Sequence, residues 1–174
     1  YNEYFGYGLS SIVFQEIRES KALAYSTYAY YSSPRRKDHA HYLQAYVGTQ
    51  PDKISDAVPA LLDIIHQMPV VESQIESARL TILKQMESER LSRRQAYWAA
   101  LSMRDLGFEH SLAPDLYQAI QDSDVLTLTN FHQRFVQGRH FTFLVLGSKE
   151  HVNLDYLARF GTLRELSIAD VFGY

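Results

Sequence analysis

Residues 22–31, with the sequence ALAYSTYAYY, and residues 41–49, with the sequence HYLQAYVGT, decide the fold. Successive side chains in both segments alternate between two faces, and both segments are rich in tyrosine, threonine and small residues, as is typical of β-strands. Residues 32–38, SSPRRKD, lie between them and supply residues that favour turns. The two segments therefore predict a long antiparallel hairpin.

Apolar residues at helical spacing surround this hairpin. The expected helices are one ending near residues 18–20, one after Pro51 that is kinked or delayed by Pro59, and others over 72–90, over 92–106 up to Gly107, from Pro114 through Ile120, from a cap at Thr127, and around Leu154 and Leu157. Two further strands are expected over 141–146 and near 163–168. This order favours an α+β fold, with a mainly antiparallel sheet covered on one face by a block of helices.

Length and composition are those of one globular domain. The chain has 174 residues, a formal net charge of −3 and no cysteine, and no apolar run approaches the length of a membrane span. Basic and acidic residues are evenly spread, so neither nucleic acid nor a membrane is an expected partner. Because the first residue is Tyr1, residues 1–174 are expected to form a single domain cut from a longer multi-domain protein.

Motifs for catalysis are absent from the sequence, including H-x-x-E-H, H-E-x-x-H, G-x-S-x-G and the glycine-rich phosphate loops. His39 and His41 are two residues apart and could share a metal ion with a third ligand, but solvated side chains near a turn are the more common case. His66 and His132 lie beside apolar helical stripes, where packed histidines are more common than general bases. No catalytic residue and no metal ligand is therefore predicted in this chain.

Residues 2–26, NEYFGYGLSSIVFQEIRESKALAYS, are the most specific stretch of the sequence. A glycine-rich turn, a Ser-Ser helix ending in F-x-x-I-R-E and a strand opening with L-A-Y-S follow one another. This stretch closely resembles the pitrilysin, or insulinase-like, zinc metallopeptidases, the inverzincins. Supporting similarities to the C-terminal half-domain of that family cover most of the remaining chain, and include GTQPDK at 48–53, LTLT at 126–129 and DVFGY at 170–174.

The resemblance implies a definite role. Enzymes of this family pair similar α+β half-domains around a chamber, one half carrying the H-x-x-E-H zinc site and the other carrying none. The present sequence resembles the half without zinc, and it begins after the strand that opens the half-domain in the family. In the family, an Arg and a Tyr seven residues apart on this half contact the substrate backbone, and Arg18 and Tyr25 have that spacing. Zinc is then expected in the catalytic half of the parent protein, with a peptide as substrate and homologous half-domains as partners.

Physical chemistry supports this assignment but leaves alternatives open. A guanidinium offers five donors, and a phenol can donate to a carbonyl oxygen or to an oxyanion. Arg18 could instead pair with Glu16 or Glu19, and Tyr25 could face the core. Two functions remain: the substrate-binding half of a zinc metalloendopeptidase, or a subunit of an inactive relative that serves in assembly, as the core proteins of respiratory complexes do.

Overall fold

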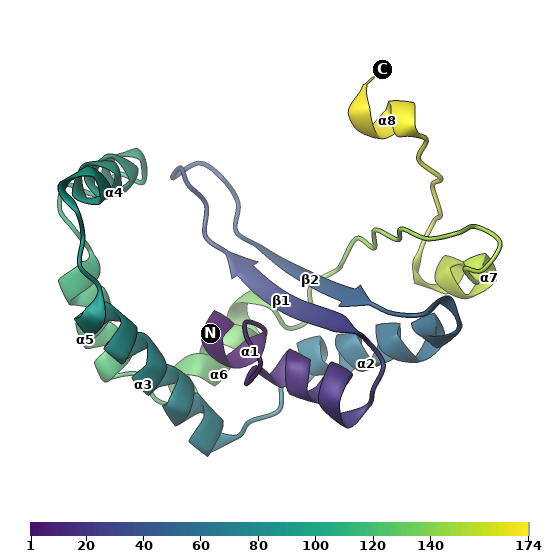
Figure 1. The fold of residues 1–174 in the computed structure, drawn as a ribbon, viewed down its shortest axis with the longest axis horizontal. Coiled ribbons are helices and arrows are strands. Elements are labelled where there is room, and N and C mark those ends of the chain that lie inside the picture. The colour runs from purple at the N-terminus through teal and green to yellow at the C-terminus, as the bar shows by residue number, and fades with distance from the viewer. Residues whose placement is uncertain (174) are drawn as a thin grey trace.

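A computed structural model describes residues 1–173 as an α+β fold in which helices lie beside and behind one hairpin (Figure 1). Tyr174, the last residue of the terminal DVFGY motif, lies outside the described residues. In chain order the elements are α1 (Asn2–Phe5), the π-helix η1 (Phe14–Ser20), β1 (Ser26–Ser32), β2 (Tyr42–Gly48), the 3-10 helix η2 (Pro51–Lys53), α2 (Ile54–His66), α3 (Glu72–Ser88), α4 (Arg93–Asp105), α5 (Ala113–Gln121), α6 (Val125–Phe135), α7 (Leu154–Leu157), the 3-10 helix η3 (Ala158–Phe160) and α8 (Ile168–Phe172).

The predicted hairpin is confirmed. Strands β1 and β2 pair antiparallel, with a register that runs from Ser26 opposite Gly48 to Ser32 opposite Tyr42. Thr27 and Ala29 are buried, while their neighbours on β1 point to solvent, so one face of the hairpin covers the core and the other is open. The first strand starts at Ser26 and not at residue 22, because the N–H groups of Lys21 and Leu23 still bond to carbonyls of η1.

The outer edge of β1 is covered by the N-terminal segment, which the sequence did not predict to be helical. The amide side chain of Asn2 accepts a hydrogen bond from the N–H of Tyr31 at 2.8 Å and donates one to its carbonyl at 3.0 Å. The carbonyl of Gly6 accepts a hydrogen bond from the N–H of Ala29 at 3.0 Å. These bonds satisfy backbone groups that an edge strand would otherwise leave free.

The core lies between the hairpin and the helices. Helix α2, which runs behind the hairpin in Figure 1, contributes Ala60, Ile64 and Ile65. The other members of this buried cluster are Tyr4, Phe5, Ile12, Val13, Ile17, Ala29, Ile75 and Val136. Residues as far apart in the sequence as Tyr4 and Val136 are therefore needed to complete one apolar cluster.

Two strand predictions are wrong. The sheet of the described residues contains only β1 and β2, and neither 141–146 nor 163–167 belongs to a strand. Ile168 instead begins α8, whose first turn is closed by a capping box between Ser167 and Asp170. Alternation and apolar content identify an extended segment, but a strand also needs a neighbouring chain at hydrogen-bonding distance. The α+β class is confirmed, with a smaller sheet than expected.

Most helix predictions are confirmed to within a few residues. Helix α2 starts at Ile54, later than Pro51 as expected, and contains Pro59. Helix α4 is capped by Ser92 and is followed by Gly107 at a φ of +87°. The predicted cap at Thr127 is wrong: Asp124 is the cap of α6, and Thr127 completes its capping box three residues later. None of the helices within residues 1–173 is both long and apolar enough to cross a membrane.

Candidate functional site

Arg18 and Tyr25, the two residues singled out by the family resemblance, lie close together. Arg18 is in the last turn of η1, and Tyr25 immediately precedes β1. The guanidinium carbon of Arg18 lies 5.7 Å from the centre of the Tyr25 ring and 4.8 Å from the centre of the Phe14 ring. Such distances allow cation–π attraction to both rings. The site is therefore an arginine side chain close to two aromatic rings.

The side chain of Tyr25 points to solvent although its backbone is fixed. Its N–H donates to the carbonyl of Gly48 at 2.9 Å, and the residue is 86% exposed. The alternative in which Tyr25 faces the core is therefore wrong. An exposed phenol on an anchored backbone is available to a ligand without any rearrangement of the strand.

The ion-pair alternative for Arg18 is present but weak. Its Nε lies 3.7 Å from a carboxylate oxygen of Glu19, and both side chains are substantially exposed to solvent. Exposed ion pairs contribute only ~0.2–1 kcal/mol. This contact occupies one donor of a guanidinium that has five, so Arg18 can still bind carbonyl or carboxylate oxygens of a ligand.

The chain reversal between Arg18 and Tyr25 is held by an unusual turn. The N–H of Lys21 bonds to the carbonyl of Glu16, five residues back, which is the π-helical pattern, and the N–H of Leu23 bonds to the carbonyl of Ile17. Between them Ala22 has a φ of +48°, in the left-handed region that alanine seldom adopts. π-Helical turns are rare and occur often at functional sites.

Two side chains from beyond the hairpin fix this turn. Lys53 Nζ donates to the carbonyl of Ala22 at 3.0 Å, and Thr49 Oγ1 donates to the carbonyl of Leu23 at 2.5 Å. Neither contact was expected from the sequence, although GTQPDK at 48–53 is one of the stretches that carry the family resemblance. The end of β2 and η2 therefore help to set the relative position of Arg18 and Tyr25.

The histidines noted in the sequence do not assemble into a site. The His41 ring stacks on the Tyr31 ring at 5.7 Å, and the backbone N–H of His39 donates to Arg36. Within residues 1–173, no group of three His, Asp or Glu side chains is placed to hold a metal ion. His132 is packed in the core, where its Nδ1 lies 3.0 Å from the Tyr1 hydroxyl, and burial lowers its pKa.

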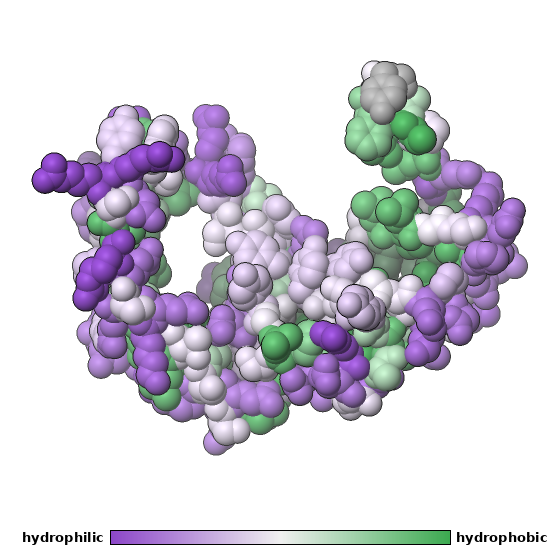
Figure 2. Space-filling view, in the orientation of Figure 1, coloured by the Kyte–Doolittle hydropathy of each residue, from purple (hydrophilic) through white to green (hydrophobic). Residues whose placement is uncertain are grey.

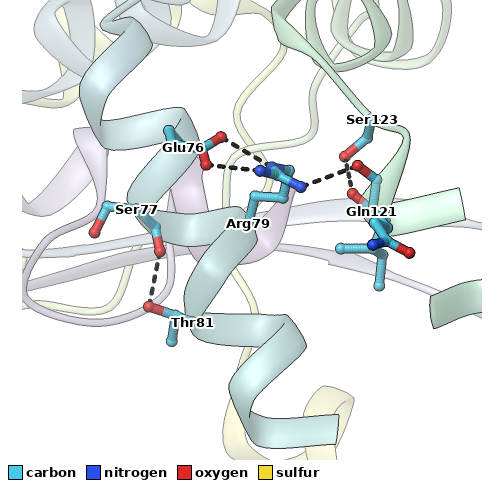
Figure 3. Close-up of polar contacts among 7 residues, drawn as sticks. Glu76, Ser77, Arg79, Thr81, Gln121 and Ser123 are labelled. Carbon is cyan, nitrogen blue, oxygen red and sulfur yellow. Dashed lines mark hydrogen bonds and ion pairs between the residues drawn. The ribbon is translucent and has the colours of Figure 1, made fainter. Parts of the chain in front are cut away.

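A second polar cluster surrounds Arg79 and was missed by the sequence reasoning (Figure 3). Its Nε and Nη2 donate to the two carboxylate oxygens of Glu76 at 2.9 and 2.6 Å, and its Nη1 donates to the carbonyl of Gln121 at 2.9 Å. The hydrogen bonds from Arg79 hold the pKa of Glu76 below its usual range. The spacing of Glu76 and Arg79 indicates a pair on one helix face, but nothing in the sequence points to Gln121. Because three guanidinium nitrogens have partners here, this cluster ties α3 to the end of α5.

The chain is similar to known proteins in the sequence of its first part and in its fold. Residues 1–69, which contain the hairpin, Arg18 and Tyr25, match the family described as peptidase M16 inactive domain. The fold is similar to a crystal structure of a protease from Helicobacter pylori, with a TM-score of 0.58 and 17% sequence identity. The alignment covers 76% of this chain and 32% of that protein. None of the curated proteins matches the chain.

The class of protein follows from these matches. Residues 1–69 of this α+β chain match the peptidase M16 inactive, C-terminal domain, and the fold of the chain is similar to that of a solved protease. The resemblance drawn from residues 2–26 is therefore confirmed. At 17% identity the structural likeness establishes the fold alone, and the chain corresponds to about a third of the Helicobacter protein.

Proposed function

We propose that this domain is the non-catalytic, substrate-binding half of a zinc-dependent metalloendopeptidase, in which Arg18 and Tyr25 contact the backbone of the peptide substrate. The proposal is based on one observation: the guanidinium of Arg18 lies beside the ring of Tyr25, and the Tyr25 side chain is exposed to solvent. The zinc chemistry then belongs to a separate domain of the parent protein. The M16 inactive-domain match supports a pairing with other domains of the same family.

The two side chains divide the work by their chemistry. The guanidinium of Arg18 donates only, so it suits carbonyl oxygens of an extended peptide. The hydroxyl of Tyr25 can donate to the carbonyl that is attacked, and this bond strengthens as negative charge develops on the oxygen. Since both contacts are to the peptide backbone, they add little selectivity for side chains.

The test is cleavage of an internally quenched, unstructured peptide by the full-length parent with zinc. Tyr25→Phe should lower kcat roughly 10²- to 10³-fold with little change in KM, because an oxyanion donor acts mainly in the transition state. Arg18→Ala should mainly raise KM. Tyr97→Phe is the matched control, since Tyr97 is an exposed tyrosine on α4.

Two results would contradict the proposal. Unchanged turnover in Tyr25→Phe would show that the Tyr25 hydroxyl does not stabilise the transition state. A folded parent that cleaves no peptide, even with its natural partner present, would instead favour an assembly subunit.

A further inference from the structure

The open face of the hairpin carries an uncharged group of tyrosines. Alternation along β1 and β2 brings Tyr28, Tyr30, Tyr42, Gln44 and Tyr46 to this side, here called the tyrosine face. The four tyrosines are between 38% and 57% exposed, and neither strand contains a charged residue. In Figure 2 the surface over the hairpin is pale, between the hydrophilic and hydrophobic ends of the scale.

Part of this face is already ordered. Tyr28 and Tyr46 are register partners, and their rings stack with centres 5.3 Å apart and planes 22° apart. Gln44 donates from its amide to the Tyr28 hydroxyl at 3.5 Å. The hydroxyl of Tyr46 lies over Gly48, 2.8 Å from where a Cβ would be. Rings that are held before binding lose little conformational entropy when a ligand arrives.

The size of the face decides what can cover it. The exposed fractions correspond to roughly 300–450 Å² of tyrosine surface, since a tyrosine side chain buries about 150–250 Å² when fully covered. A stable interface between folded proteins buries about 800 Å² on each partner. The tyrosine face alone is therefore smaller than an interface between folded proteins, and a single extended segment can cover it.

The tyrosine face lies close to the Arg18–Tyr25 pair along strand β1. Strand β1 begins directly after Tyr25, so Tyr28 lies about 10 Å further along the strand at ~3.3 Å per residue. From Tyr25 to the Ser32–Tyr42 pair at the far end of the hairpin, the distance corresponds to about seven residues of extended peptide. The first ring of the tyrosine face is thus within about three residues of extended peptide from the Arg18–Tyr25 pair.

We propose that the tyrosine face binds the part of an extended peptide substrate that lies to one side of the Arg18–Tyr25 pair, and that it selects uncharged apolar and aromatic side chains there. The inference rests on the proposed function in so far as the ligand is a peptide. Phenol rings stack on apolar and aromatic groups, and their hydroxyls exchange hydrogen bonds with peptide amides. The lack of charge on β1 and β2 gives no attraction to a charged segment.

The experiment measures binding, by fluorescence anisotropy, of labelled peptides to the full-length parent after zinc removal, so that cleavage does not interfere. One peptide is short and ends near the Arg18–Tyr25 pair, a second extends it by six residues that include Phe and Leu, and a third extends it by Ser and Gly. The variants are Tyr30→Ala and Tyr42→Ala, whose rings make no stacking contact within the described residues. Tyr97→Ala on α4 is the control.

The aromatic extension should tighten binding to the wild-type parent, and the two variants together should weaken that peptide roughly 5- to 30-fold while leaving the other two unchanged. Equal affinity of variants and wild type for the aromatic peptide would overturn the proposal. Equal weakening of all three peptides, or a loss of assembly seen by gel filtration, would also overturn it, because the face would then be structural or covered by a folded domain. If Arg18→Ala leaves the short peptide unaffected while the aromatic extension still responds, the proposed function fails and the tyrosine face stands.

Discussion

Gly6→Ala tests how closely the N-terminal segment approaches the hairpin. A Cβ at Gly6 would lie 2.3 Å from the carbonyl oxygen of Ala29 and 2.6 Å from both its N and its Cβ. These atoms belong to a fully buried strand residue and cannot move aside as the end of a long side chain can. Since Gly6 has a φ of −146°, outside the left-handed region that favours glycine, the close approach to Ala29 is the main cost expected of the substitution.

The expected magnitude follows from two costs. Forcing a methyl group into a packed site costs about 1–3 kcal/mol. The bond from the Ala29 N–H to the Gly6 carbonyl must lengthen or break, and a buried N–H left without a partner costs about 1–3 kcal/mol. The free energy of unfolding should therefore fall by about 2–6 kcal/mol, which corresponds to a decrease in Tm of about 4–24 °C for a domain of this size.

Thermal unfolding followed by circular dichroism measures this change. Gly138→Ala is the matched control, because Gly138 has a φ of +72° with no atom within 4 Å of the added methyl group. The control should cost only about 1–2 kcal/mol, from the left-handed backbone alone. A loss of stability in Gly6→Ala no larger than in Gly138→Ala would refute the reasoning, since α1 could not then be seated against the edge of β1.

Three further substitutions test other parts of the fold. Burial lowers the pKa of His132, so the unfolded chain binds a proton more readily than the folded chain. The contribution of His132 to stability should be complete above the ordinary pKa of about 6.5 and should be lost as the pH decreases through the lowered value. Urea denaturation across this pH range should show that the free energy of unfolding of His132→Gln changes less with pH than that of the wild type. Ala22→Gly should be neutral or stabilising by up to ~1 kcal/mol, because it removes the steric cost of an alanine in the left-handed backbone region. The control, Ala99→Gly within α4, should destabilise by ~1 kcal/mol, and thermal unfolding of both variants measures the difference. Asn2→Asp removes the donor to the edge of β1 and should lower the free energy of unfolding by about 1–3 kcal/mol, while Asn130→Asp on exposed α6 should leave the denaturation midpoint nearly unchanged.

Features that depend on nearby residues could be predicted from the sequence. Alternation over 22–31 and 41–49 fixed the antiparallel pairing of the hairpin, and apolar spacing located the helices of the middle region to within a few residues. Arg18 and Tyr25 could be paired because a helix end and a strand start separated by a short turn must lie close together. The family resemblance supplied the chemistry expected of them, which spacing alone does not contain.

Features that depend on distant residues could not be predicted in this way. The short helix α1 exists because Asn2 and Gly6 bond to a strand more than twenty residues later. The contact between Arg79 and the Gln121 carbonyl spans 42 positions and involves a backbone group, which leaves no trace in residue type. For residues 141–146 the sequence predicted a strand that does not form. The pattern is typical of a strand, but the sheet within the described part of the chain contains only β1 and β2.

The turn that holds Arg18 and Tyr25 links the proposed function to the stability of the hairpin. Thr49, directly after β2, and Lys53, in η2, bind carbonyls of this turn, so Arg18 and Tyr25 keep their relative position only while β2 stays paired with β1. The tyrosine face depends on the same pairing, because Tyr28 and Tyr46 stack across it. A substitution that separates the strands should therefore weaken both proposed contacts with a peptide at once. Tyr25→Phe and Tyr30→Ala each alter one of these proposed contacts, and their effects should be additive. Additivity between these two single variants would show that the pair and the face are separate contacts on one rigid hairpin.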